Sequence, residues 1–103
     1  MILAASNNRS EILHLLGANQ AKIKSFGVRS LGLFGSVARG DATDMSDLDF
    51  IVEFERKSFD AYMDLKFFLE ELFGKRVDLA LAEGIKPRLR ERILEDAVHA
   101  PGL

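Results

Sequence analysis

The 103-residue sequence contains no cysteine. This absence excludes a disulfide scaffold, a thiolate metal site and catalysis by a cysteine nucleophile. No apolar run approaches the ~18 residues that a membrane-spanning helix needs, and the apolar segment 1–5 is too short for the core of a signal peptide. We therefore expect a cytoplasmic protein that does not span a membrane.

The sequence also lacks an excess of charge of either sign. Lys and Arg number 14 against 16 Asp and Glu, which gives a formal net charge of −2. Domains that bind nucleic acid directly are usually strongly basic, so we expect no such binding. With 48% hydrophobic and 29% charged residues, and with no repeat or linker-like tract, the sequence predicts one folded domain over residues 1–103.

The apolar periodicity predicts a mixed α/β order of elements. A helical stretch from about Asn8 to Phe26 is expected to divide at Gly17 into two short helices. Two strands follow, then a helix, a third strand and a last helix. Their expected ranges are 28–34, 48–54, 58–73, 77–81 and 85–97.

The second predicted strand carries two carboxylates on its polar side. Asp47 and Asp49 lie two residues apart, so both project away from the apolar side that holds Leu48 and Phe50. Two carboxylates 4 Å apart repel by roughly 4 kcal/mol at an effective dielectric constant of ~20. If the two aspartates only begin an exposed strand, solvent removes this repulsion. If they form a metal site, a divalent cation such as Mg²⁺ removes it.

A possible phosphate-binding turn follows the first predicted strand. Gly35 allows backbone amides to approach an anion closely, Ser36 adds a hydroxyl, and Arg39 adds a forked cation. Gly and Ser are also common in ordinary turns, so this segment alone is weak support for a site.

Asp78 lies on the polar side of the third predicted strand, between Val77 and Leu79. Taken alone, an aspartate at this position is common on the solvent-exposed side of a half-buried sheet. If the strands form one sheet, however, Asp78 shares an open face with Asp47 and Asp49. Three carboxylates beside a phosphate-binding turn are typical of a two-metal site for phosphoryl or nucleotidyl transfer.

These motifs are similar to a known signature. Residues 35–40 (GSVARG) and 46–52 (SDLDFIV) closely resemble the nucleotidyltransferase signature of the polymerase-β superfamily. Within it, the chain resembles the minimal nucleotidyltransferases (MNT), the antitoxins that pair with HEPN toxins in prokaryotes. The resemblance covers nearly the whole chain and includes residues 26–28, 77–79 and 86–90.

The resemblance implies a polymerase-β-like core, a mixed β-sheet of at least three strands backed by helices on one face, with the site on the other face. It implies transfer of AMP from ATP to a tyrosine hydroxyl of a HEPN RNase toxin, which silences the toxin. It also implies that Gly35 and Ser36 hold the triphosphate and that Arg39 steadies a phosphate or the turn.

The metal site is likewise implied by the resemblance. Asp47 and Asp49 would bind two Mg²⁺ ions, and Asp78 would complete the metal site and help to deprotonate the acceptor hydroxyl. Two alternatives stay open: an antitoxin that acts by binding alone, and an enzyme that modifies a small molecule such as an antibiotic.

The predicted last helix carries four cations within seven residues, from Lys86 to Arg92. A solvated helix surface explains such a run, and so does contact with ATP phosphates or an acidic partner. The single tyrosine, Tyr62, is expected to have a packing role.

Overall fold

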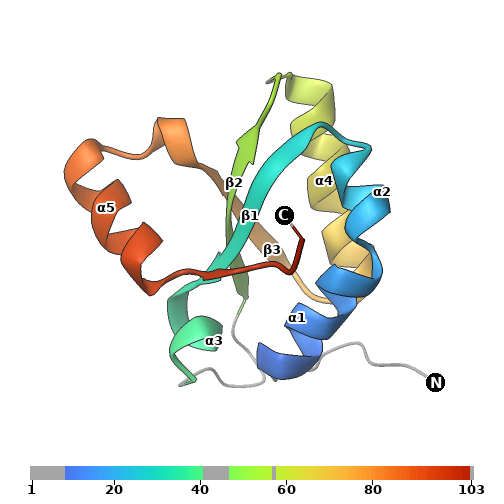
Figure 1. Cartoon of the computed structure of the whole chain (residues 1–103), viewed down its shortest axis with the longest axis horizontal. Helices are drawn as coiled ribbons and strands as arrows, with labels where there is room; N and C mark the ends of the chain where they lie inside the picture. The colour runs from blue at the N-terminus through green and yellow to red at the C-terminus, as the bar shows by residue number, and fades with distance from the viewer. Residues whose placement is uncertain (1–8, 41–46, 57, 103) are drawn as a thin grey trace.

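The computed structural model describes residues 9–40, 47–56 and 58–102. These residues form helices and strands in a mixed order (Figure 1). In chain order they are α1 (Arg9–Ala18), α2 (Gln20–Lys24), β1 (Val28–Phe34), α3 (Gly35–Arg39), β2 (Leu48–Phe54), α4 (Phe59–Phe73), β3 (Val77–Leu81), the 3₁₀ turn η1 (Ala82–Gly84), α5 (Pro87–Asp96) and β4 (Val98–His99).

The strands form one mixed sheet in the order β3-β2-β1-β4. Strand β1 runs antiparallel to both β2 and β4, whereas β2 and β3 run parallel. The expected mixed sheet of at least three strands is therefore confirmed. The parallel pair is possible because α4 connects its strands as a crossover, which parallel strands require.

Helices α1, α2 and α4 cover one face of this sheet (Figure 1). The core lies between that face and the helices, because every second residue of β2 points toward it. Leu48, Phe50 and Val52 are fully buried there, together with Leu65 and Leu69 of α4. Helix α5 differs from the others, because it lies on the other side of the sheet (Figure 1).

The local sequence sets both ends of α4. The Ser58 side chain accepts a hydrogen bond from the Ala61 backbone N–H at 3.0 Å, which caps the start of the helix. Gly74 ends the helix with a φ of 63°, a left-handed conformation that suits glycine. At 15 residues α4 is the longest helix described. No helix in the described ranges is both long and apolar enough to cross a bilayer.

The two short helices expected in this stretch are confirmed as α1 and α2, but the division does not fall at Gly17. Helix α1 continues through Gly17 to Ala18, and the break falls at Asn19, whose side-chain amide donates to the Leu15 carbonyl at 2.8 Å. A Cβ at Gly17 would lie 3.4 Å from Pro101 Cβ, an ordinary contact distance, so the end of the chain lies against α1 at this point. The expected first helical residue, Asn8, lies outside the described residues.

The predicted last helix, 85–97, forms as α5 (Pro87–Asp96), but it contributes no buried residue to the core. None of the ten residues of α5, all of them described, is buried, and Leu89 is 50% exposed. Beyond α5, Val98 and His99 pair with Leu33 and Gly32 to form β4, a short strand that the sequence pattern did not predict.

The cap at Ser58 gives a first prediction. Ser58→Ala should lower the free energy of unfolding by about 1 kcal/mol, because one N–H at the start of α4 loses its acceptor. Urea titration followed by circular dichroism measures the change. Ser58→Asp is the control, since an aspartate caps about as well as a serine. Equal losses in both variants would contradict a role in capping.

Candidate active site

Two carboxylates lie side by side where β2 and β3 begin. Asp49 and Asp78 are Cα partners in the parallel register of these strands, so their side chains leave the sheet on the same face. Their neighbours Leu48 and Phe50 belong to the buried core. The carboxylates therefore occupy the face opposite α1, α2 and α4.

The electrostatics of Asp49 reflect this arrangement. Partial burial raises the pKa of Asp49 above its ordinary value of 3.8, and the nearby carboxylates of Asp78 and Asp47 raise it further. Arg39 acts in the opposite direction and lowers the pKa of Asp49. Asp47 itself lies just before β2 and is exposed. Asp47 and Asp78 thus both lie within electrostatic reach of Asp49.

Gly35 brings the start of α3 against the Asp49 carboxylate. Phe34, the last residue of β1, is the register partner of Asp49, so the chain turns into α3 beside that side chain. Gly35 has a φ of +78°, and a Cβ at this position would overlap Asp49 Oδ2 and lie 3.0 Å from Cγ. The position therefore needs glycine both for its backbone and for its space.

The other predicted residues of this turn lie on α3. Ser36 follows Gly35 in the first turn of α3 and is half-buried, and Arg39 is an exposed residue at its end. A hydrogen bond of 2.8 Å from Arg9 Nη1 to the Ala38 carbonyl joins the end of α3 to α1. This bond helps to hold α3, and with it Gly35, in place beside Asp49.

The donor set suits a hard cation, although it is not a complete cage. Within the described ranges, no three His, Cys, Asp or Glu side chains lie close enough together to hold a metal ion. Mg²⁺ usually takes one or two carboxylates and completes its shell with water and substrate phosphates. The Asp49 and Asp78 pair, whose mutual repulsion a cation would relieve, therefore fits Mg²⁺ in its chemistry.

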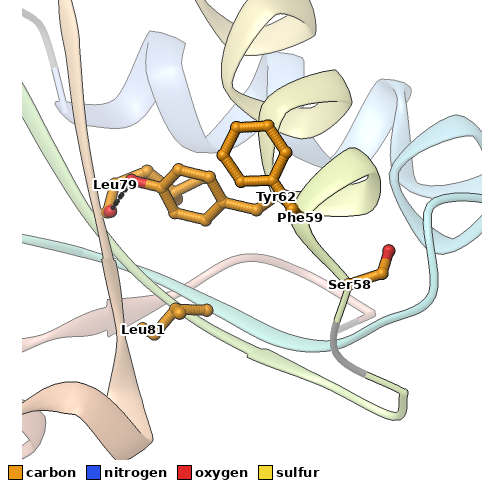
Figure 2. A pocket seen from close by; sticks show the side chains of 5 residues that line it. All are labelled: Ser58, Phe59, Tyr62, Leu79 and Leu81. Carbon is orange, nitrogen blue, oxygen red and sulfur yellow. Dashed lines mark hydrogen bonds between the residues drawn. The ribbon is translucent and has the colours of Figure 1, made fainter.

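An apolar cavity lies elsewhere, between α4 and β3 (Figure 2). It measures about 510 Å³ and is lined by Ser58, Phe59, Tyr62, Leu79 and Leu81. The Tyr62 hydroxyl donates to the Leu79 carbonyl at 2.6 Å, so it is engaged in packing, as expected. None of these five side chains is an acid or a base of the kind gathered around Asp49.

Sequence reasoning anticipated the shared open face but missed the contact between Gly35 and Asp49. Gly35 was expected to admit a phosphate, and the structure adds that it leaves room for a carboxylate. The only signal available was a glycine at a strand end next to a strand that carries aspartates. Ser46, which belongs to the signature, lies outside the described residues.

Comparison with known proteins identifies the family. The family described as "Nucleotidyltransferase domain" matches residues 15–99. The protein adenylyltransferase MntA of Thermococcus cleftensis is 37% identical over 91 residues, which cover 86% of this chain and 92% of the relative. A Methanocaldococcus jannaschii protein, provisionally named a protein adenylyltransferase, is 38% identical over 87% of this chain and 95% of its own length.

Solved structures support the same family assignment. A structure provisionally named a minimal nucleotidyltransferase superposes with a TM-score of 0.70 at 41% identity, covering 84% of this chain and 93% of that chain. The structure of a tri-AMPylated Shewanella oneidensis HEPN toxin in complex with an MNT antitoxin matches with a TM-score of 0.62 at 18% identity, covering 88% of this chain and 73% of that chain. At 18% identity, the second similarity shows only that the two chains share a fold.

The mixed sheet, the aspartate pair on its open face and the glycine turn beside it thus occur in a chain that shares sequence and fold with known nucleotidyltransferases. The chain belongs to the nucleotidyltransferase domain family and, within it, to the minimal nucleotidyltransferases that include the protein adenylyltransferase MntA.

Proposed function

We propose that this nucleotidyltransferase is an Mg²⁺-dependent antitoxin, a single domain that transfers AMP from ATP to a tyrosine hydroxyl of a HEPN toxin and thereby silences it. The observation that carries the proposal is the in-register pair of Asp49 and Asp78 against Gly35. It is combined with 37% identity to a named protein adenylyltransferase. Because the donor is ATP, we expect the reaction to occur in the cytoplasm.

Structures of related fold support the donor and the partner. One is described as a toxin–antitoxin with AMP-PNP, an ATP analogue, and another as a tri-AMPylated HEPN toxin with an MNT antitoxin. These descriptions concern those proteins, which are 20% and 18% identical to this chain. They make ATP the donor and a HEPN protein the acceptor to test first.

We assign the nucleotide to the turn between β1 and α3. Backbone N–H groups at Gly35 and the hydroxyl of Ser36 would bind triphosphate oxygens, because both follow directly on the strand end beside Asp49. Arg39, which already acts electrostatically on Asp49, would balance negative charge at the same place. This assignment would bring the donor phosphates next to the carboxylates.

We assign the metal to Asp47 and Asp49, with Asp78 as the third carboxylate. Two bound Mg²⁺ ions would neutralise charge on the attacking and leaving oxygens. Asp49 is the residue that one cation would relieve most, since burial and both other carboxylates oppose its ionisation. Asp78 is exposed and on the same face, which suits a group that accepts the proton of the acceptor hydroxyl.

In the proposed reaction the tyrosine oxygen forms a bond to the α-phosphorus of ATP. The bond between that phosphorus and the β-phosphate bridging oxygen breaks, and pyrophosphate leaves with the electron pair. The proton of the hydroxyl passes to Asp78. The chain contributes mainly position, because nucleotidyl transfer depends on alignment and on neutralised charge.

Removal of one carboxylate tests the proposed enzymatic activity. Asp49→Asn should lower AMP transfer to a HEPN protein at least 100-fold, because it removes a charged ligand from the proposed metal site. The assay measures incorporation of α-labelled AMP and the mass of the acceptor. Asp64→Asn, which neutralises an exposed aspartate on α4, is the matched control and should keep full activity.

Two outcomes would contradict parts of this proposal. Full activity in Asp49→Asn would refute the metal assignment. Binding of the HEPN protein by the unaltered chain, without any AMP transfer in the presence of ATP and Mg²⁺, would favour the binding-only antitoxin instead. Transfer of AMP to a small molecule but not to protein would favour an antibiotic-type enzyme.

The glycine contact gives a paired prediction. Gly35→Ala should reduce AMP transfer at least tenfold, because its Cβ would push the Asp49 carboxylate aside. Gly40→Ala is the control: Gly40 has a similar φ of +84°, yet a Cβ there would meet nothing within 4 Å. The two variants should lose similar stability in thermal melts but differ in rate. Equal rates would show that the contact has no role in activity.

The raised pKa of Asp49 predicts a stability effect without metal. An acid whose pKa is higher in the folded than in the unfolded chain destabilises the fold once it ionises. This cost is absent below about pH 3.8 and grows as the pH rises through the raised value. In EDTA, Asp49→Asn should therefore melt above the unaltered chain at pH 7 and lose that advantage at pH 3. A lower melting temperature at pH 7 would contradict the electrostatics described here.

A further inference from the structure

Helix α5 presents a large share of its surface to solvent. None of its ten residues, each of which the structure describes, is buried. Leu89 is 50% exposed and Leu94 is 37% exposed. At these two leucines, helix α5 therefore carries apolar surface that its own chain leaves partly uncovered.

The side of α5 that contacts the chain is occupied by other residues. Arg90 and Ile93 are half-buried, and Arg90 Nη2 donates to the Ile85 carbonyl at 3.3 Å. Arg90 is thus directed back toward its own chain. The remaining cations of the helix and of its N-cap, Lys86, Arg88 and Arg92, are all exposed.

These three cations line one cavity together with Leu89. Lys86, Arg88, Leu89 and Arg92, which we call the α5 basic face, line a shallow cavity of about 360 Å³. Arg88 and Arg92 are four residues apart, so they stand one above the other on the helix and repel each other. An anionic surface bound to this face would attract both arginines and so offset the repulsion between them.

The charges of α5 also oppose the dipole of the helix. Its N-cap is Lys86, Arg88 lies in the first turn, and the first turn contains no acid. The helix ends with Glu95 and Asp96, and its last turn contains no base. Anions stabilise the start of a helix and cations its end, so this distribution lowers the stability of α5. Helix stability therefore does not explain why these residues are there.

The helix leads directly to the face of the sheet that carries the active site. Ala97 Cβ, one residue after α5, lies 3.3 Å from where a Cβ at Gly32 would stand, and Ile51 Cγ2 lies 3.4 Å from the same point. Ile51 is two residues from Asp49 on β2, so both point to this face. A macromolecule docked on α5 would therefore lie on the same side of the sheet as the aspartate pair.

We propose that the α5 basic face docks the protein acceptor of the reaction through an acidic patch that surrounds an apolar side chain. This proposal rests on the proposed function, because it assumes a protein acceptor. The exposed Leu89 among these cations favours a protein over a nucleic acid, because a phosphate backbone offers no apolar side chain to cover it.

The test reverses two charges on this face. Arg88→Glu/Arg92→Glu should raise the Kd for a purified HEPN protein and the KM for that protein at least tenfold, because attraction becomes repulsion. The KM for ATP should stay within twofold. Lys24→Glu/Arg29→Glu is the matched control: both residues are exposed, and the change in net charge is the same. Calorimetric titration gives the Kd, and thermal melts check that each variant folds.

Leu89→Asp separates the apolar part of the interaction from its charge and should also weaken binding at least tenfold. Unchanged binding in both α5 variants would overturn the docking proposal, and so would an increase in the KM for ATP instead of the acceptor. Loss of binding to a fluorescent 20-nucleotide RNA, with binding of the HEPN protein unchanged, would assign the face to nucleic acid. A dimer in sedimentation that Leu89→Asp dissociates would assign it to a second copy of this chain.

The two proposals fail in different ways. If the HEPN protein binds through Arg88 and Arg92 but no AMP is transferred, the docking face is supported and the proposed enzymatic activity is refuted. If AMP is transferred and the α5 variants do not change the transfer, the enzymatic activity is supported and the docking face is refuted. A HEPN protein that does not bind the unaltered chain would overturn the docking proposal.

Discussion

The register of β2 is the constraint on which both the core and the site depend. Residues alternate between the faces of a strand, so Leu48 and Phe50 can enter the core only if Asp49 points to the other face. A slip by one residue would direct Asp49 into the core and expose its apolar neighbours. A buried, unpaired carboxylate is costly. The hydrophobic packing that holds the sheet together therefore also fixes where the site carboxylates point.

The site itself works against the stability of the free chain. Asp49 is partly desolvated and faces two further carboxylates, and Arg39 offsets only part of this effect, since the pKa of Asp49 remains raised. Alternation along β2 and β3 is enough to predict from sequence that Asp49 and Asp78 share a face. Their pairing in direct register could not be predicted, because it depends on which strands become neighbours and on how they align.

Most of the fold could be predicted where local sequence and packing agree. The bounds of Val28–Phe34 and Leu48–Phe54 follow from alternating apolar residues, and they match the structure. The prediction was less exact where apolar alternation does not set a boundary. Gly17 lies inside α1, and the break between α1 and α2 falls two residues later, at Asn19. Strand β4 has two residues, too few for a period, and is recognised only through its pairing with β1.

A macromolecular acceptor would explain why α5 exposes apolar surface and carries charges that oppose its dipole. Transfer requires the acceptor oxygen to lie close to phosphorus and in line with the leaving group. In the proposed reaction the aspartates and the turn at Gly35 would align the donor, but they offer little surface to orient a whole protein. A helix next to that face, with its leucine exposed and its charges set against its own dipole, is a poor element for stability alone. It is well suited to orient a partner, because its uncovered apolar surface and its cations can both be satisfied from outside the chain.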